Sequence, residues 1–201
     1  MGWIAMVLGS FLCGSLPFSV WLGKLFLNED VRNYGDGNPG AANVFRSGSK
    51  VLGLLALILD VSKAAVPVGL SYYNLGIRGI PMILIAIAPI LGHVFSPFLR
   101  FRGGKAIAAT LGVWIGLTIW RASSVGVIGT VLGIILMTSA GWAVMLGLVM
   151  ILIALIFWMP DPLLLMVWVS ETIILAWTHR NDLRQKPALR PWLTRSFLSK
   201  R

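Results

Sequence analysis

Long apolar runs separated by short polar stretches dominate this sequence, and they predict membrane-spanning helices. Most of the runs are long enough to cross a hydrocarbon core of about 30 Å as an α-helix. Repeated Gly, Trp and small residues within them suit close helix packing in lipid, whereas the alternating pattern of a membrane β-barrel is missing. We therefore predict an all-α, polytopic membrane protein with about seven transmembrane helices, at residues 3–27, 51–73, 80–99, 106–120, 122–138, 141–159 and 162–178.

The composition agrees with a membrane protein and bears on the domain organisation. Of the 201 residues, 57% are apolar and 12% are charged, which is too hydrophobic for a soluble domain of this length. The largest hydrophilic stretches, residues 28–50 and 179–201, are too short to form soluble domains of their own. We therefore expect residues 1–201 to form a single integral membrane domain.

The net charge of +10 lies mainly in the predicted loops, and its distribution predicts the orientation of the chain. If the N-terminus is outside, only Arg78 and Arg121 fall on the outer side, and Lys63 lies within a span. The opposite side then holds Lys24, Arg32, Arg46, Lys50, Arg100, Arg102, Lys105 and the seven basic residues from Arg180 onward. Basic residues concentrate in cytoplasmic loops, so we expect a multi-pass protein of the inner (plasma) membrane with an outside N-terminus and a cytoplasmic C-terminus. This clustering also argues against nucleic acid as a partner.

Two glycine-rich, basic loops on the predicted cytoplasmic side indicate a phosphate site. The first is G-D-G-N-P-G-A-A-N-V-F-R at residues 35–46, and the second runs from Gly92-His93 to F-R-G-G-K at residues 101–105. Glycine lets backbone N–H groups turn toward a ligand where a side chain would clash, and nearby cations favour a dianion. Lys105 also stands at a predicted helix start, where the helix dipole favours an anion.

Less specific interpretations of the same loops stay open. Residues 35–40 match the G-x-G-x-x-G dinucleotide fingerprint, but a membrane span precedes them instead of a buried strand. Their Gly, Asn, Asp and Pro residues would also suit an ordinary surface turn. Arg100 and Arg102 could serve only as an interfacial anchor. The second loop lacks the upstream glycine and the following Ser or Thr of a Walker A loop, which argues against an NTPase.

The other ionisable groups in or near the spans have structural as well as functional interpretations. Asp60 and Lys63 are three residues apart on one helix face, where a structural ion pair is the favoured interpretation. Glu171 is expected to be a buried, hydrogen-bonded carboxyl. A lone histidine such as His93 more often serves packing than catalysis, and His179 with its neighbours could form an interfacial collar. With two histidines and one cysteine in the chain, no metal site is predicted.

Taken together, the spaced motifs resemble those of the bacterial acyl-phosphate:glycerol-3-phosphate acyltransferases. The resemblance covers most of the first 115 residues and returns in the tail. It rests on Gly14-Ser15, the loop at 35–46, Leu59-Asp60-x-x-Lys63, Gly92-His93, F-R-G-G-K at 101–105 and His179-Arg180-x-Asp182. The family is similar in topology as well, with seven helices, an outside N-terminus and an active site that faces the cytoplasm.

This resemblance implies a reaction and a set of site residues. A fatty acyl group would pass from acyl phosphate to the 1-hydroxyl of glycerol 3-phosphate, giving lysophosphatidic acid and phosphate in phospholipid synthesis. Acyl phosphate would be held by Gly37, Asn38, Gly40, Ala41 and Asn43, and glycerol 3-phosphate by Arg46, Lys105, His179 and Asn181. Lys105, Arg46 and Ser139 would serve catalysis. Beyond these substrates and membrane lipid, no cofactor, metal or obligate protein partner is implied.

The sequence contains no convincing Ser-His-Asp or Cys-His set, which argues against a covalent acyl-enzyme. Acyl phosphate already carries a good leaving group. Alignment of the acceptor hydroxyl and stabilisation of developing charge could therefore supply most of the acceleration. The resemblance implies substrate-assisted catalysis, in which a substrate phosphate accepts the proton.

The sequence departs from the family in its third motif. Where the family has Arg-Tyr-x-Ser-Leu-x-Ser, the nearest stretch here is M-T-S-A-G-W-A at residues 137–143, in which only Ser139 could replace a serine. Ala42 stands where the family has threonine.

Two alternative functions stay open: an acyltransferase for another phosphorylated acceptor, and a phosphate or anion transporter. A transporter should place its binding groups near the membrane midplane, whereas the cations here cluster at one surface.

Overall fold

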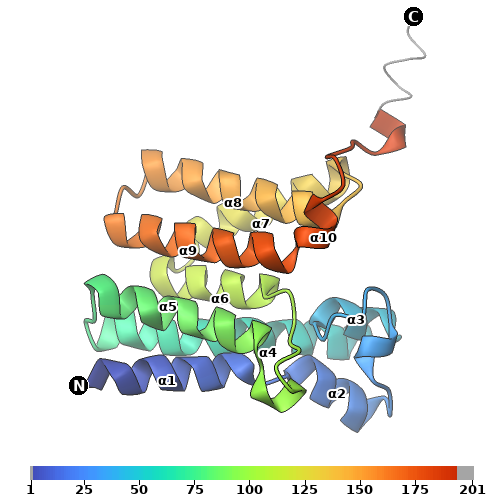
Figure 1. The fold of residues 1–201 in the computed structure, drawn as a ribbon, viewed down its shortest axis with the longest axis horizontal. Helices are drawn as coiled ribbons and strands as arrows, with labels where there is room; N and C mark the ends of the chain where they lie inside the picture. The colour runs from blue at the N-terminus through green and yellow to red at the C-terminus, as the bar shows by residue number, and fades with distance from the viewer. Residues whose placement is uncertain (1, 194–201) are drawn as a thin grey trace, which may run out of the picture. The chain divides into compact units, whose positions relative to one another are not determined.

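The computed structural model describes residues 2–193, which fold into helices and connecting loops. The chain divides into two compact units, Met1–Ile119 and Trp120–Arg201, whose helices can be followed by colour in Figure 1. The first unit holds α1 (Gly2–Ser15), α2 (Phe18–Phe26), α3 (Ala41–Arg46), α4 (Lys50–Gly69), α5 (Gly79–Val94) and α6 (Ile107–Thr118). The second unit holds α7 (Arg121–Leu136), α8 (Ala140–Phe157), α9 (Pro162–Thr178) and α10 (Arg180–Leu183).

A break at Leu16 and Pro17 separates α1 from α2 within one apolar segment (Figure 1). Pro17 has no N–H group to continue the helical hydrogen bonds, and its ring disfavours a helical conformation of the preceding residue. Carbonyl groups at the break find partners elsewhere in the first unit. Ser96 Oγ donates to the Ser15 carbonyl at 2.6 Å, and Lys63 Nζ donates to the Leu16 carbonyl at 2.7 Å.

A buried ion pair on α4 supports this break. Lys63 Nζ lies 2.7 Å from Asp60 Oδ1, and Ser19 Oγ in the first turn of α2 donates to Asp60 Oδ2 at 2.7 Å. The side chains of Lys63 and Asp60 are only 3% and 2% exposed. Charges within an apolar span need a partner, and this geometry confirms that the two residues form an ion pair; its structural role stays a prediction. We call Ser19, Asp60 and Lys63 the α2–α4 clasp.

Close approach of glycines to neighbouring backbones allows the helices of the first unit to pack tightly. Gly14 of α1 lies against the backbone of Pro89 in α5, and Gly92 of α5 lies against the Phe11 carbonyl in α1. A Cβ atom at either glycine would overlap these backbone atoms. Such close contact supplies the van der Waals attraction that holds helices together in lipid.

In the second unit, α7 and α9 both pack against α8, and the segment after α10 returns to the turn between α7 and α8. The backbone N–H of Thr138 donates to the Ala188 carbonyl at 3.0 Å, and that of Arg190 donates to the Leu136 carbonyl at 2.9 Å. An isolated antiparallel bridge joins Met137 to Leu189. The chain after the last apolar helix is therefore fixed to the loop that contains Ser139.

The structure confirms the predicted all-α membrane fold, and its helices follow the predicted apolar runs closely. Four segments of the described chain, Gly2–Phe26, Lys50–Asn74, Gly79–Leu99 and Ala140–Phe157, are long and apolar enough to cross a membrane. Three further apolar helices, α6, α7 and α9, are shorter. The number of spans, the orientation of the termini and the single-domain organisation stay predictions. Of the basic residues assigned to the cytoplasmic side, Arg195, Lys200 and Arg201 lie outside the described residues.

Candidate functional site

Short-range hydrogen bonds build the first glycine-rich loop, between α2 and α3. It begins with a 3₁₀ turn at Val31–Asn33, where the Asp30 carboxylate accepts from the backbone N–H of Arg32 at 3.1 Å and from its guanidinium at 2.6 Å. The hydrogen bond from the Arg32 side chain is the main reason that the pKa of Asp30 falls to about 2. Gly35 and Gly37 then take φ values of 58° and 73°, which glycine adopts without steric strain.

Asn43 holds this loop against α3. It lies in the first turn of the helix, which begins at Ala41, and it is only 1% exposed. Its Nδ2 donates to the Asn38 carbonyl at 2.9 Å and to Asp36 Oδ1 at 3.2 Å, while its Oδ1 accepts from Arg46 Nη1 at 2.8 Å. One buried amide therefore positions both a carboxylate and a guanidinium.

Folding of the second glycine-rich loop back onto the end of α5 brings it close to the buried His93. After a 3₁₀ turn at Pro97–Leu99, the N–H groups of Gly103 and Gly104 donate to the carbonyls of Val94 at 3.0 Å and His93 at 3.1 Å. A Cβ atom at Gly103 would overlap the His93 carbonyl, and one at Gly104 would overlap the His93 ring. Glycine is therefore required at both positions by the packing behind the loop.

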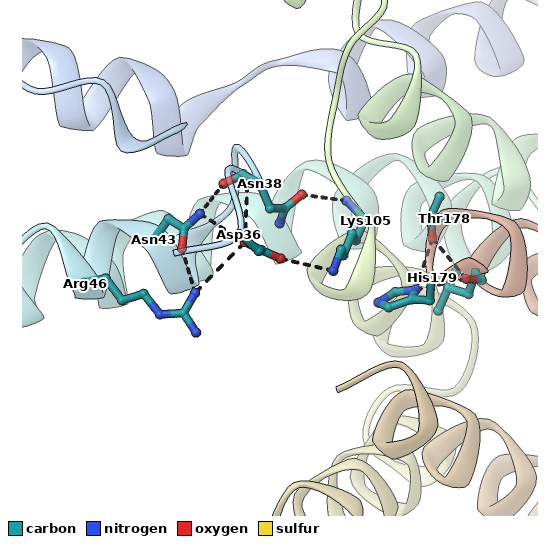
Figure 2. A network of polar contacts seen from close by, with 8 residues as sticks. Asp36, Asn38, Asn43, Arg46, Lys105, Thr178 and His179 are labelled. Carbon is teal, nitrogen blue, oxygen red and sulfur yellow. Dashed lines mark hydrogen bonds and ion pairs between the residues drawn. The ribbon is translucent and has the colours of Figure 1, made fainter. Parts of the chain in front are cut away.

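Lys105 joins the two loops. Its backbone N–H donates to Asn38 Oδ1 at 2.9 Å, and its Nζ lies 3.0 Å from Asp36 Oδ2. Arg46 Nη1 lies 4.0 Å from Asp36 Oδ1. Figure 2 shows Asp36 between Lys105 on one side and Arg46, with Asn43, on the other. Two cations from distant parts of the sequence therefore converge on one carboxylate.

The sequence alone does not single out Asp36, although it lies at the centre of this site. Partial burial raises the pKa of its carboxyl, but hydrogen bonds from Lys105, Asn38 and Asn43 outweigh that effect, so the pKa lies below its ordinary value of 3.8. The carboxylate is therefore ionised at neutral pH. The position of Asp36 between Gly35 and Gly37 is a sequence signal that could have identified it as a site residue. Turn-forming propensity explains the same Gly-Asp-Gly pattern, however.

Several backbone donors of the glycine loops are already used inside the protein. Besides the N–H groups of Gly103 and Gly104, that of Gly37 donates to the Tyr34 carbonyl at 3.1 Å, and that of Gly40 donates to the Asn38 carbonyl at 2.8 Å. The expectation that glycine N–H groups turn toward a ligand is therefore wrong for these four. The site instead offers an anion the side-chain cations Lys105 and Arg46.

Three predicted site residues lie in the second unit. His179 directly follows α9 and is only 1% exposed, and its Nδ1 lies 2.9 Å from the Leu175 carbonyl and 3.1 Å from Thr178 Oγ1 (Figure 2). Asn181 lies in α10 and is exposed. Ser139 is the N-cap residue of α8 and is half-buried.

The structure thus places the predicted site residues in two groups. The first unit holds Gly37, Asn38, Gly40, Ala41, Asn43, Arg46 and Lys105, and the second holds Ser139, His179 and Asn181. Their individual roles stay predictions. Arg100 and Arg102, for which an anchor is the alternative interpretation, are exposed. Among the residues that the structure describes, no three His, Cys, Asp or Glu side chains gather as they would around a metal ion.

A family model described as glycerol-3-phosphate acyltransferase matches residues 4–186 of this chain. A glycerol-3-phosphate acyltransferase of Maridesulfovibrio salexigens is 34% identical over 189 residues, which cover 92% of this chain and 93% of that protein. One from Aromatoleum aromaticum is 44% identical over 124 residues, and that match covers 62% of this chain and 62% of the relative's length.

Two solved structures have the same fold. The crystal structure of PlsY (YgiH), an integral membrane glycerol 3-phosphate acyltransferase, in its glycerol 3-phosphate form gives a TM-score of 0.83 at 23% identity, covering 98% of this chain and 100% of that one. The lysophosphatidic acid form gives a TM-score of 0.81 at 23% identity, covering 92% and 91%. At this level of identity the likeness establishes the architecture, and function has to be argued from the site.

Proposed function

This chain belongs to the glycerol-3-phosphate acyltransferase family, and we propose that it transfers a fatty acyl group from acyl phosphate to the 1-hydroxyl of glycerol 3-phosphate. The products are lysophosphatidic acid and phosphate. The observation that carries the proposal is the convergence of Lys105 and Arg46 beside the first glycine-rich loop. Both substrates carry phosphate. The Asn43 amide holds the Arg46 guanidinium, and the Asn38 amide holds the backbone of Lys105.

Lys105 and Arg46 would hold the phosphate of glycerol 3-phosphate. Charge-assisted hydrogen bonds to phosphate are about twice as strong as neutral ones, and a planar guanidinium can bind two phosphate oxygens at once. Asn38 fixes the Lys105 backbone and Asn43 fixes the Arg46 guanidinium, so the guanidinium is already oriented before the phosphate binds. The acyl phosphate would lie along the first loop, against Gly37, Asn38, Gly40, Ala41 and Asn43.

The proposed reaction needs alignment more than a nucleophilic residue. The acceptor hydroxyl oxygen would attack the carbonyl carbon of acyl phosphate, and the bond from that carbon to the phosphate oxygen would break. Phosphate leaves with the electron pair of that bond, and the hydroxyl proton passes to a phosphate oxygen of the substrate. Lys105 and Arg46 would contribute by fixing the acceptor and by stabilising developing negative charge.

We also propose roles for three residues of the second unit, His179, Asn181 and Ser139. The His179 ring is held by the Leu175 carbonyl and therefore has a defined orientation. The exposed amide of Asn181 can donate to a phosphate or hydroxyl oxygen and accept from a hydroxyl. Ser139 is proposed to take a catalytic part in place of the family's third-motif serine.

We also propose that the site faces the cytoplasm from the inner membrane. Large apolar side chains beside both loops, at Phe45, Phe98 and Phe101, are exposed, which suits contact with lipid next to the site. An acyl chain could then remain in the membrane while its phosphate reaches Lys105. The positive-inside distribution of the basic loops supports the cytoplasmic side.

Purified protein in liposomes tests this function. We expect phosphate release from acyl phosphate that depends on glycerol 3-phosphate and needs neither nucleotide nor added metal. Turnover with acyl-CoA but none with acyl phosphate would overturn the donor. Acyl transfer to another phosphorylated polyol, with none to glycerol 3-phosphate, would overturn the acceptor. Uptake of labelled phosphate without acyl transfer would support a transporter instead.

A further inference from the structure

The carboxylate of Asp36 already neutralises part of the charge that the proposed acceptor phosphate would need. Its Oδ2 lies 3.0 Å from Lys105 Nζ, and its Oδ1 lies 4.0 Å from Arg46 Nη1. The side chain is 44% exposed, so the carboxylate lies where a ligand from solvent would meet both cations. Counting one negative and two positive charges, the three side chains carry a net charge of +1.

The orientation of this carboxylate is imposed by the loop. Asp36 Oδ1 accepts from the backbone N–H of Asn38 at 3.2 Å and from Asn43 Nδ2 at 3.2 Å. These two bonds leave Oδ2 directed at Lys105, as Figure 2 shows. Any phosphate that binds Lys105 must therefore either displace the carboxylate or lie beside it, and both arrangements cost binding free energy.

The site lies close to apolar surface that suits lipid. Phe98, Phe101 and Ile107, on both sides of Lys105 in the sequence, are exposed, and so is Phe45 beside Arg46. At a membrane surface, the most abundant competing anions are the phosphodiester groups of lipids, each with one negative charge. Two unopposed cations there would attract these headgroups as well as a substrate.

We propose that Asp36 is an internal competitor anion that raises the binding threshold of the Lys105–Arg46 site. Phosphodiester monoanions then stay unbound at their surface concentration, while a phosphomonoester dianion, with stronger attraction to the two cations, still binds. This inference rests on the proposed function for the identity of the phosphomonoester. Asp36 thus sets the affinity threshold of the site, and it exchanges some affinity for freedom from headgroup inhibition.

Asp36→Asn is the informative variant because it keeps the size of the side chain and removes its charge, and with the charge the contact to Lys105 Nζ. The new amide oxygen can still accept from Asn38 and Asn43, so the loop keeps its internal bonds. We expect the KM for glycerol 3-phosphate to fall by about fivefold or more, since a unit negative charge near a dianion is removed. Glycerophosphoglycerol, a soluble phosphodiester, should inhibit the variant at a concentration about twofold lower or more than it needs with the unsubstituted protein, since Asp36 repels a monoanion about half as strongly as a dianion.

Asp30→Asn is the matched control. Asp30, in the same loop as Asp36, also binds an arginine and lies near a lysine, but these are Arg32 and, in α2, Lys24. Asp30→Asn makes the same change in net charge, but it should leave the KM for glycerol 3-phosphate and the inhibitory concentration of glycerophosphoglycerol unchanged. An equal fall in the KM for glycerol 3-phosphate in Asp30→Asn would overturn the proposal, and so would an unchanged or raised KM in Asp36→Asn. Asp36 would then be a residue that only orders the loop. If Asp36→Asn does not fold, Asp36→Ser takes its place in the same measurements.

A binding measurement separates this inference from the proposed function. Inorganic phosphate should raise the thermal unfolding temperature of Asp36→Asn at lower concentration than it does for the unsubstituted protein, because ligand binding stabilises the folded state. This result needs no catalysis. Failure of acyl transfer in both proteins, together with stronger phosphate binding by the variant, would reject the proposed function and support the role of Asp36. Equal phosphate binding by both proteins would reject that role.

Discussion

Lys105 and Arg46 reach the same carboxylate with different exposure and different supports. The Lys105 side chain is 27% exposed, and its backbone is bonded to Asn38, whereas Arg46 is 56% exposed and is bonded through its guanidinium to Asn43. A hydrogen bond therefore positions Lys105 through its backbone N–H group and Arg46 through its guanidinium group. Because each cation has its own asparagine, substitution of one leaves the support of the other in place.

Lys105→Ala and Arg46→Ala should each lower kcat/KM for glycerol 3-phosphate by about 10- to 100-fold. A hydrogen bond to a charged group contributes roughly 1.5–3 kcal/mol, and about 1.4 kcal/mol corresponds to a factor of ten. Both side chains lie at loops, so their loss should not prevent membrane insertion. Steady-state acyl transfer by purified variants, with glycerol 3-phosphate varied, measures the effect.

Arg100→Ala is the control for this pair. Arg100 is exposed in the same loop as Lys105, and we interpret it as an interfacial anchor. It should retain nearly unchanged kinetics, since removing a surface cation away from the ligand changes little. Unsubstituted rates for Lys105→Ala and Arg46→Ala at subsaturating glycerol 3-phosphate would show that these cations only follow the positive-inside rule.

At the scale of elements, the break between α1 and α2 depends on groups that lie far away in the sequence. Lys63 of α4 serves both the Leu16 carbonyl and Asp60, and Asp60 in turn accepts from Ser19 in α2. α2 leads into the loop that carries Asp36, and Gly23 of α2 packs against Val31 of that loop. The α2–α4 clasp therefore supports the segment that precedes the candidate site.

The clasp should be more sensitive to the loss of one charge than to the loss of both. Lys63→Met leaves Asp60 as a buried carboxyl without its cation, and breaking a buried pair in this way costs about 3–5 kcal/mol. The double variant Asp60→Asn/Lys63→Met removes the uncompensated charge, so its unfolding free energy should lie closer to that of the unsubstituted protein. Denaturant or thermal unfolding in detergent measures the stability of the unsubstituted protein, Lys63→Met and the double variant. A double variant less stable than Lys63→Met would contradict the assignment of the clasp as an ion pair.

The apolar helices could be predicted from the sequence because their signal is local. Hydropathy over a run such as 141–159 is sufficient to predict α8, since burial in lipid needs no particular partner. The contact between Asn38 and the Lys105 backbone could not be predicted in this way, because it depends on how two loops meet in space. The position of Asp36 between two cations could not be predicted for the same reason, since it depends on the contact between the two loops.

At the scale of the whole molecule, the predicted orientation depends on whether the shorter helices cross the membrane. α6 has 12 residues, α7 has 16 and α9 has 17. At 1.5 Å per residue they extend about 18, 24 and 26 Å, against a hydrocarbon core of about 30 Å. Short spans can be accommodated by local thinning of the bilayer at modest cost. Seven spans, with the N-terminus and the C-terminus on opposite sides, require that α6, α7 and α9 all cross the membrane.

Single-cysteine reporters test this topology in a Cys13→Ala background, which removes the natural thiol. Asn74 is exposed at the end of the span Lys50–Asn74, and Gln185 is exposed after α10. Trp120 lies in the turn between α6 and α7. An impermeant maleimide should label Asn74→Cys and Trp120→Cys in right-side-out vesicles and Gln185→Cys only in inside-out vesicles. Labelling of Trp120→Cys from the inner side would show that α6 does not cross. The fully reversed pattern would place Lys105 and Arg46 outside, where a cytoplasmic phosphorylated acceptor could not reach them, and would overturn the proposed orientation of the site.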